Sequence, residues 1–400
     1  MYLIVIVLLM ALSLGGCAGP ADVMSNVRED FGISQSEEGT GESSQGLGEK
    51  TPVSYDDHFL VSGTKYAYGT LSSEQKLWYD DVEHILGSMA KEGELATEGI
   101  VRGLTEKDID YVFSCVCMDH PELFYVEGYS YVTHMLGDQI VGYVFSGSYS
   151  MDREEALRRE REILSVAAEI RAGFLSSGAD DYAKIKYVYE TLIKRTEYDL
   201  DAPDNQTIYS ALVGGRSVCQ GYAKSMQYLL NGMGVECTLV QGVAMGQPHG
   251  WNLVKSDGEY YYVDVTWGDN SYHPGETGDN GPEILYDYLL VTTAEIEMEH
   301  LIDMEVPLPF CTSMDDSYFL RENAYFTKAD EAGLRALFQM ASPEDSYQVS
   351  IKCASYECFN DIKKLLLDKN KIFEYYPAGR TQISYYQNEE LLCLTFWVTN

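Results

Sequence analysis

Three side chains that can do chemistry together stand in one short stretch of the sequence, residues 214–267. They are Cys219, His249 and Asp264, in that order along the chain. An imidazole can take the proton from a thiol, and a carboxylate beside the imidazole holds its tautomer and orientation. If the fold brings the three together, their types predict nucleophilic catalysis through a cysteine.

Cys219 falls in the first turn of a predicted helix. Gly214-Gly215 interrupts the preceding segment, and we expect Ser217 to be the N-cap. Apolar residues then recur at helical spacing, at Tyr222, Met226, Leu229, Leu230 and Met233, before Gly234 ends the pattern. Free N–H groups and the macrodipole at this end of a helix favour a thiolate. The alternative is an inert core residue, because free cysteines are usually buried.

His249 and Asp264 belong to two strand-like runs that flank Asp257-Gly258. The runs are residues 249–255 and 259–266. Asp-Gly between such runs predicts a hairpin with a two-residue loop. In that register Asp264 is the diagonal neighbour of His249 on the same face, whereas a three-residue loop would place them on opposite faces. The catalytic hypothesis therefore predicts the turn. Taken singly, the alternatives are a structural histidine and an ordinary strand-end residue.

Three motifs carry a resemblance to a known family. They are Val218-Cys219-Gln220-Gly221-Tyr222-Ala223, His249-Gly250-Trp251-Asn252 and Tyr262-Val263-Asp264-Val265-Thr266-Trp267. They resemble the core of the transglutaminase-like superfamily of papain-like thiol enzymes, in which a cysteine opens a helix, a histidine opens a strand and an aspartate lies on the next strand. The resemblance covers roughly residues 180–270.

The resemblance implies an α+β fold whose papain-like, transglutaminase-like core packs a nucleophile helix on an antiparallel sheet. It implies that Cys219 is the nucleophile, His249 the general base and acid, and Asp264 the orienting group. Gly250 stands where many relatives have Ala. No side chain at a fixed spacing before Cys219 stands out as an oxyanion donor. Gln206, Tyr209 and the backbone N–H of Cys219 with a neighbour are the candidates.

The charge balance excludes some ligands. Lys and Arg number 28 against 63 Asp and Glu, a formal net charge of −35. This argues against nucleic acid and anionic membrane surfaces as direct ligands and favours cationic partners. The sequence has no CxxC pair, no histidine cluster with metal-ligand spacing, and no phosphate-binding or dinucleotide fingerprint. We therefore expect no structural metal and no cofactor.

The N-terminus is predicted to be a targeting segment. Residues 2–14 are an apolar run too short for a clear spanning helix, and Leu14-Gly15-Gly16-Cys17 follows. Small residues before a cysteine resemble a bacterial lipoprotein signal, which implies cleavage before Cys17 and acylation of that residue. A plain secretory signal is the alternative. On either interpretation the mature chain acts outside the cytoplasm, and on the first a lipid anchors it in a bacterial cell membrane.

Composition and periodicity divide the chain into five parts. We expect a lipoprotein signal peptide over residues 1–16 and a flexible acidic tether, rich in Ser, Gly and Glu, over 17–65. An N-terminal α+β accessory region follows over 66–173, then the transglutaminase-like core over 174–308 and a small C-terminal α/β module over 309–400, for which a ferredoxin-like arrangement is one option. Cys353 could pair with Cys358 or Cys393.

The predicted function is that of an extracytoplasmic cysteine enzyme. The resemblance implies acyl transfer on amides of a peptide or a glutamine side chain, with hydrolysis by a cysteine protease favoured over cross-linking. The partner would be a protein or peptide substrate, such as a cell-wall or surface protein. A non-catalytic binding or adhesion module on the same fold is the alternative, and an amidase acting on cell-wall peptide is a third option.

Overall fold

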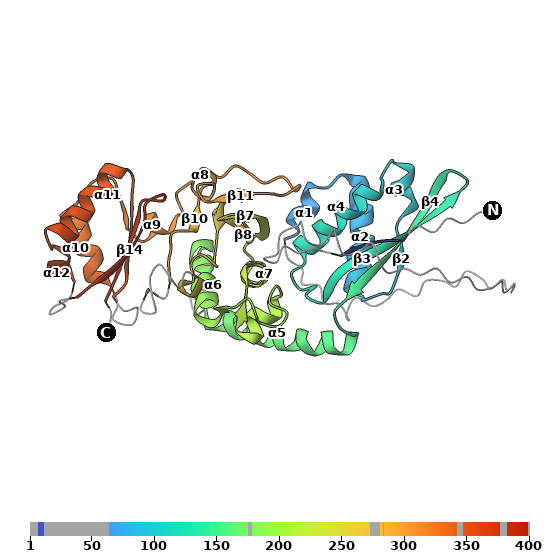
Figure 1. Cartoon of the computed structure of the whole chain (residues 1–400), viewed down its shortest axis with the longest axis horizontal. Helices are drawn as coiled ribbons and strands as arrows, with labels where there is room; N and C mark the ends of the chain where they lie inside the picture. Colours follow the sequence, from blue (N-terminus) through green and yellow to red (C-terminus); the bar gives the residue numbers. More distant parts are fainter. Residues whose placement is uncertain are drawn as a thin grey trace.

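The structure is a computed structural model. It describes residues 7–11 (backbone), 64–174, 178–272, 281–282, 284–341, 347–376 and 382–398. An N-terminal module, a central core and a C-terminal module follow one another along the long axis of the molecule (Figure 1). Cys17 and most of the predicted signal peptide and tether lie outside the described residues. Val7–Ala11 forms strand β1, and the signal peptide stays a prediction.

The N-terminal module packs helices on one four-stranded sheet of order β1-β3-β4-β2. Two long strands form its centre, β3 (Val126–Leu136) and β4 (Gln139–Tyr149), and β2 (Gly93–Glu94) lies at one edge. The helices are α1 (Tyr66–Thr70), α2 (Ser73–Gly87), α3 (Thr97–Val101) and α4 (Glu106–Asp119). Thr105 and Asp108 form a capping box at the start of α4, in which the Asp108 carboxylate accepts from the Thr105 backbone N–H at 2.8 Å.

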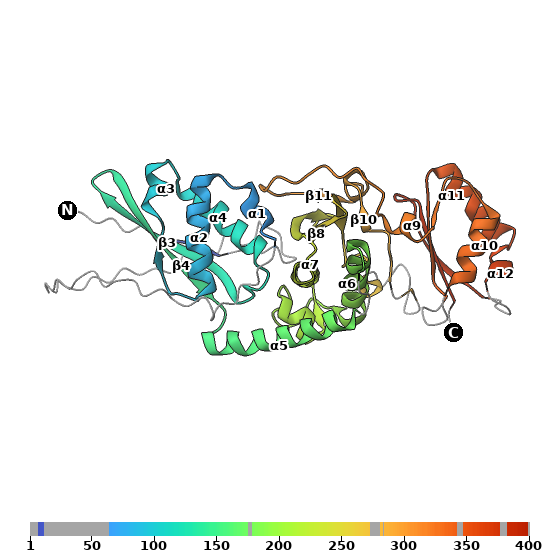
Figure 2. The same cartoon turned by 180° about the vertical axis from the view of Figure 1, so that it is seen from behind.

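A long helix, α5 (Arg153–Gly173), leads from this module along the edge of the core, as both views show (Figure 2). Its Arg and Glu side chains form ion pairs at the surface, as the charge pattern predicted. The next helix, α6 (Asp181–Arg195), buries one apolar stripe against helix α7 (Cys219–Gly232). Short elements connect them: β5 (Glu197–Tyr198), a π-turn η2 (Ser210–Gly214) and β6 (Arg216–Ser217).

The core is an antiparallel sheet of five strands in the order β10-β9-β8-β7-β11, with α7 packed on one face. Its strands are β7 (Cys237–Ala244), β8 (Gln247–Ser256), β9 (Glu259–Val263), β10 (Leu289–Val291) and β11 (His300–Ile302). The turn η3 (Asn270–Tyr272) and helix α8 (Thr293–Ile296) lie in the connections. This is the helix-on-antiparallel-sheet arrangement that the resemblance implied.

The N-terminal module and the helical face of the core share one hydrophobic cluster, which runs from Ala67 to Val306. Gln227 of α7 also donates a hydrogen bond from Nε2 to the carbonyl oxygen of Met118 in α4, at 2.8 Å. The nucleophile helix is therefore held from behind by the accessory region. The other face of the sheet has a separate cluster around Trp251 and Trp267.

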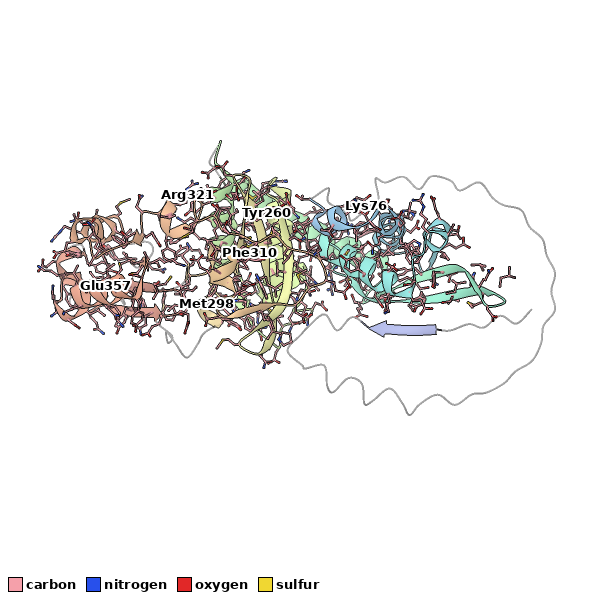
Figure 3. All side chains as sticks on the ribbon, turned by 90° about the horizontal axis from the view of Figure 1, so that it is seen from above. Lys76, Tyr260, Met298, Phe310, Arg321 and Glu357 are labelled. Carbon is pink, nitrogen blue, oxygen red and sulfur yellow. The ribbon has the colours of Figure 1, made fainter. Side chains whose placement is uncertain are left out.

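The C-terminal module has a four-stranded sheet of order β12-β13-β15-β14. Its elements are α9 (Tyr318–Arg321), β12 (Tyr325–Phe326), α10 (Glu331–Met340), β13 (Val349–Cys353), α11 (Tyr356–Lys363), η4 (Lys364–Asp368), α12 (Ile372–Tyr375), β14 (Ser384–Asn388) and β15 (Cys393–Trp397). The ferredoxin-like option is wrong, because all the module's helices precede the final hairpin, whereas a ferredoxin-like chain places its second helix before the last strand. Arg321, labelled in Figure 3, ties the module to the core by donating to Asp180 and Asp316.

The cysteines in the described part of the chain are all free thiols, Cys353, Cys358 and Cys393 among them. The pairings left open by the sequence are therefore not made. Within the described residues, no helix combines the length and the apolar character needed to cross a bilayer.

His120, at the end of helix α4, contacts two carboxylates, that of the buried Glu122 and that of the partly buried Glu83 of α2. Its Nδ1 lies 2.9 Å from Glu122 Oε1, and its Nε2 lies 3.3 Å from Glu83 Oε1. Burial alone would lower the pKa of His120, but the two carboxylates raise it to about 9. Because the folded pKa exceeds the unfolded value of about 6.5, this group stabilises the fold fully below pH 6.5, and its contribution is lost as pH rises through about 9.

We expect His120→Gln to lower the melting temperature more at pH 6 than at pH 9.5, by roughly 5–10 °C, since the lost ionic contribution is about 3 kcal/mol. Scanning calorimetry at the two pH values measures this difference. His134→Gln, at an exposed position on the β3–β4 hairpin, is the control and should leave both melting temperatures unchanged. An equal loss at both pH values for His120→Gln would contradict the charged assignment.

Candidate active site

Cys219 is the first residue of α7, and Val218 rather than Ser217 is the N-cap. The predicted cap at Ser217 is wrong because that hydroxyl is used elsewhere: it donates to the carbonyl oxygen of Asn205 at 2.6 Å. The loop carrying Asn205 packs so closely on the first turn of α7 that a Cβ at Gly221 would lie 2.9 Å from the Thr207 carbonyl oxygen. Glycine at 221 lets this loop and the cysteine helix meet.

The predicted two-residue hairpin loop is confirmed. Ser256 pairs with Glu259, and Asp257 and Gly258 both have positive φ, at 46° and 89°. The ladder ends at Asn252 and Val263, three residues before the predicted end of the second strand. The chain then turns toward β10. The turn gives the register that the catalytic hypothesis required.

Asp264 lies just beyond the end of β9, fully buried, and its carboxylate accepts four hydrogen bonds. Oδ1 accepts from the backbone N–H groups of Thr266 at 2.9 Å and Trp267 at 3.1 Å. Oδ2 accepts from Nε2 of His249 at 2.7 Å and Nε2 of His300 at 2.9 Å. Burial alone would raise the pKa of Asp264, but the two imidazoles hold it well below its usual value. The carboxylate is therefore charged and fixed in position.

His249 connects this carboxylate to the thiol. Its Nε2 is engaged by Asp264, and its side chain also interacts with the Cys219 thiol. Burial lowers the pKa of His249, but Asp264 and then Cys219 outweigh it and raise the pKa above its usual value. The site thus favours an imidazolium beside the thiol. Cys219 is 2% exposed and His249 4% exposed, so little water reaches the pair.

Aromatic rings enclose the histidine. The rings of Trp251, Trp267 and Tyr272 lie 5.8, 6.1 and 6.3 Å from that of His249. A low-dielectric surrounding of this kind strengthens the interaction between the imidazole and Asp264. The packed aromatic rings also restrict the orientation of the imidazole between Asp264 and Cys219.

Two side chains, Tyr209 and Gln206, are the predicted candidates for an oxyanion donor. The Tyr209 hydroxyl donates to Glu162 of α5 at 2.8 Å, which engages it away from Cys219. Gln206 uses its backbone carbonyl to accept from Lys224 at 3.3 Å, and its side chain stays a prediction as a donor. The remaining candidate is the N–H of Cys219, since the first N–H groups of a helix have no intrahelical acceptor.

Gln220, next to the nucleophile, explains the glycine of the His-Gly-Trp-Asn motif. Its side chain is 1% exposed, and a Cβ at Gly250 would lie 3.0 Å from its Nε2. The amide therefore lies directly on the backbone of the histidine strand. An alanine at 250 would have to displace it by a few tenths of an ångström.

His300 is the site residue that the sequence analysis missed. It lies on β11, opposite Ala244 of β7, and reaches Asp264 across 36 residues of sequence. No motif surrounds His300, and the sequence marks it only by its place beside a short apolar run. The ligand atoms of His249, Asp264 and His300 lie within 4.8 Å of one another, close enough for a metal ion. Both Nε2 atoms face one carboxylate oxygen, so an ion would have to replace the hydrogen bonds that orient His249.

Asp269 and His273, in the polar loop after Trp267, were the other residues that could have lined the site. Asp269 is buried and accepts a hydrogen bond from the Tyr222 hydroxyl of α7 at 2.5 Å, which makes it a structural partner of the helix. His273 lies outside the described residues. The described chain therefore offers His249 as the imidazole that meets the thiol.

The fold brings together a thiol at a helix start, an imidazole on a strand and a carboxylate after the next strand. Residues 168–265 match the family model of the transglutaminase-like superfamily. This part of the chain, with all three side chains inside it, is thus a transglutaminase-like core. No curated protein matches the chain.

Several solved structures resemble part of the chain. A transglutaminase is 16% identical over 35% of this chain and 44% of its own, with a TM-score of 0.25. The periplasmic domain of TgpA from Pseudomonas aeruginosa is 15% identical over 36% of this chain and 73% of its own, with a TM-score of 0.21. The TM-scores are low, so the family match and the geometry carry the assignment. The chain spans less than half the length of the first of these structures.

The pairing of Cys219 with His249 predicts how the thiol reacts. We expect iodoacetamide to alkylate Cys219 rapidly at pH 6, because an imidazolium stabilises the thiolate, and His249→Ala to slow this by about 100-fold. His300→Gln should slow it less, since Asp264 keeps its other three donors. Mass spectrometry of the labelled cysteines measures both rates.

Cys237 is the internal control, since burial raises its pKa well above the usual value and it should stay unlabelled at pH 6. Equal labelling of Cys219 at pH 6 in the parent chain and in His249→Ala would contradict the thiolate–imidazolium pair.

Proposed function

We propose that this chain is a cysteine enzyme that transfers acyl groups from amides, with Cys219 as nucleophile, His249 as base and acid, and Asp264 as the residue that orients the imidazole. One observation carries the proposal: a buried carboxylate accepts from the same imidazole that is hydrogen-bonded to a thiol at a helix start. A merely structural histidine would not need both partners. The substrate class is a peptide or a glutamine side chain.

The reaction follows from the positions of the groups. The Cys219 sulfur attacks the carbonyl carbon of the amide, and the carbonyl oxygen gains charge near the first N–H groups of α7. His249, holding the thiol proton, gives it to the leaving amine as the C–N bond breaks. The products of this half are an amine and a thioester on Cys219.

The second half releases the acyl group. His249, now neutral, takes a proton from water, and the oxygen attacks the thioester to give a carboxylic acid and the free thiol. An amine in place of water would give a new amide. We propose hydrolysis as the main outcome, in keeping with the peptidase activity that the resemblance implies.

A non-catalytic binding module is the second candidate. Two observations favour it: Cys219 is only 2% exposed, and the Tyr209 hydroxyl is engaged by Glu162. Such a module would keep the fold and present its surface to a protein of the cell envelope. Turnover separates it from the enzyme.

We expect the full chain to hydrolyse amides in a broad peptide mixture, and Cys219→Ser to reduce the rate by at least about 1,000-fold. Products formed in heavy-oxygen water should carry the label in the new carboxylate, which separates hydrolysis from amide exchange. Cys117→Ser in α4 is the control and should keep the parent rate. Turnover that survives Cys219→Ser would overturn the enzyme proposal, and binding without turnover in both chains would favour the binding module.

We also propose that the mature chain faces outside the cytoplasm, attached to the membrane by a lipid on Cys17. Support comes from the apolar run and Leu14-Gly15-Gly16-Cys17. In a bacterial host, labelled fatty acid should enter the parent chain and not Cys17→Ser. Equal labelling of both chains would overturn the anchor.

A further inference from the structure

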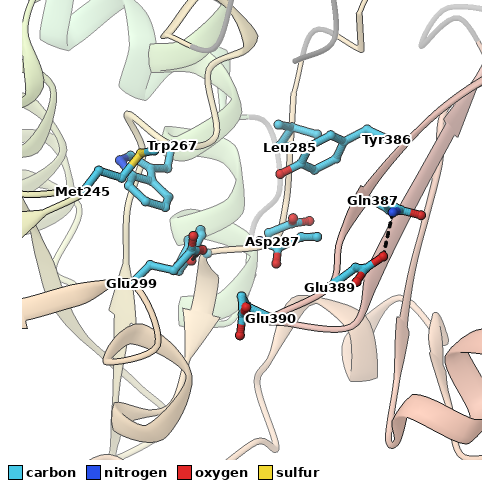
Figure 4. Close-up of a pocket in the computed structure, with 11 residues that line it drawn as sticks. Met245, Trp267, Leu285, Asp287, Glu299, Tyr386, Gln387, Glu389 and Glu390 are labelled. Carbon is cyan, nitrogen blue, oxygen red and sulfur yellow. Dashed lines mark hydrogen bonds between the residues drawn. The ribbon is translucent and has the colours of Figure 1, made fainter. Parts of the chain in front are cut away.

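A second buried carboxylate lies outside the catalytic centre and faces a cavity. Asp287, just before β10, is 3% exposed, and among the described residues neither of its carboxylate oxygens has a donor in good hydrogen-bond geometry, although Lys352 and Asn388 interact with it. It lines a cavity of about 210 Å³ between the core and the C-terminal module (Figure 4). Buried polar groups are nearly always hydrogen-bonded, so an unpaired carboxylate facing open space indicates a missing partner.

The walls of this cavity are acidic. Glu299 comes from the core and Glu389 and Glu390 from the turn after β14, so four of its eleven lining residues are acidic with Asp287. No Lys or Arg is among these described lining residues. Lys352 is a cation close to Asp287, but its ammonium nitrogen forms an ion pair with Glu295 Oε1 at 2.6 Å. The lining of the cavity is therefore acidic, and Lys352 offsets only part of its negative charge.

The remaining walls fit a carbon chain. Aromatic rings of Trp267, Tyr288 and Tyr386 and the side chains of Met245 and Leu285 line it. Aromatic faces attract ammonium and guanidinium groups, and apolar walls accept the methylene stem that carries them. A water molecule needs roughly 15 Å³, so the cavity has room for a group far larger than a bare ion.

The carboxylates do not converge as metal ligands do. Among the described residues, the group of three histidine, cysteine or acidic side chains whose ligand atoms lie within 4.8 Å of one another is His249, Asp264 and His300. Asp287, Glu299, Glu389 and Glu390 form no such group. Spread over the wall of a cavity, they suit a larger cation with several N–H donors.

We propose that this cavity binds an organic cation, an ammonium or guanidinium on a short carbon chain. The occupant is either a small free amine or a basic side chain of a substrate, and the substrate version rests on the proposed function. The cation donates hydrogen bonds to Asp287 and the neighbouring glutamates. Burial raises the pKa of Asp287 to about 6, with Lys352 and Asn388 offsetting only part of the shift, and a bound cation would restore the charged form.

The cavity shares a wall with the catalytic centre. The Trp267 ring lines the cavity and lies 4.5 Å from the ring of His300. The backbone N–H of Trp267 donates a hydrogen bond to Asp264. Tyr288, another lining residue, lies 5.1 Å from His300. An occupant therefore contacts the rings that pack on the histidines, which places it beside the site and separate from the thiol.

Titration calorimetry with the Cys219→Ser chain tests the binding without turnover. The probes are 1,5-diaminopentane, a capped peptide with one lysine, the same peptide with norleucine, and calcium chloride. We expect the diamine or the lysine peptide to bind and the norleucine peptide not to. Whichever binds more tightly identifies the source of the cation.

Asp287→Asn should weaken binding by roughly 30-fold or more, since it removes a buried charge without changing shape. Glu390→Gln, at an exposed position that leaves folding undisturbed, should weaken it by about threefold. Glu357→Gln, on an exposed part of α11 (labelled in Figure 3), is the matched control and should change nothing.

Two results would overturn the inference: no binding of either amine, or equal affinity in Asp287→Asn, Glu390→Gln and Glu357→Gln. Calcium binding that Asp287→Asn abolishes would also overturn it, in favour of a metal ion. Amine binding in a chain that hydrolyses no peptide would leave the cavity proposal standing without the enzyme. Peptide hydrolysis unaffected by Asp287→Asn, with no amine binding, would leave the enzyme standing without the cavity.

Discussion

The carboxylate of Asp264 is the group on which the centre depends. Removing a carboxylate from water costs several kcal/mol unless its lone pairs are satisfied, and here four donors from four residues converge on it. Two of those donors are backbone N–H groups of the residues that follow Asp264, so the local turn supplies half of the hydrogen bonds to the carboxylate. The other two are imidazoles from separate strands. Strands β8 and β11 and the chain after β9 therefore meet at the Asp264 carboxylate.

This convergence sets the demands on the rest of the core. The β8–β9 hairpin has a two-residue loop, and a three-residue loop would have placed His249 and Asp264 on opposite faces. Helix α7 has to begin at Cys219 so that its thiol meets the other side of the same imidazole. Gly221 and Gly250 supply the close approaches, one for the loop that precedes the helix and one for the Gln220 amide. The N-terminal module then fixes α7 from behind through Gln227.

Local patterns in the sequence predicted the elements that carry Cys219, His249 and Asp264. Periodicity predicted the helix that Cys219 begins, Asp257-Gly258 predicted the hairpin register, and the catalytic roles rest on the resemblance. Local reasoning failed where a partner comes from far along the chain. Ser217 was expected to cap the helix, yet its hydroxyl is bound by Asn205, and His300 reaches Asp264 through a strand pairing that no motif marks. The cavity beside Trp267 was equally hidden, because half of its walls belong to the C-terminal module.

Asp264 and Asp287 show how environment separates two residues of one type. Both are buried, yet the pKa of Asp264 is lowered and that of Asp287 is raised. Burial acts on both in the same direction, so the difference comes from the partners: Asp264 accepts four hydrogen bonds, whereas Lys352 and Asn388 offset only part of the effect of burial on Asp287. A fold that satisfies one buried carboxylate so completely has left the other facing a cavity lined with further negative charge. The organic cation proposed for this cavity would supply donors to Asp287 and offset the charge of the neighbouring glutamates.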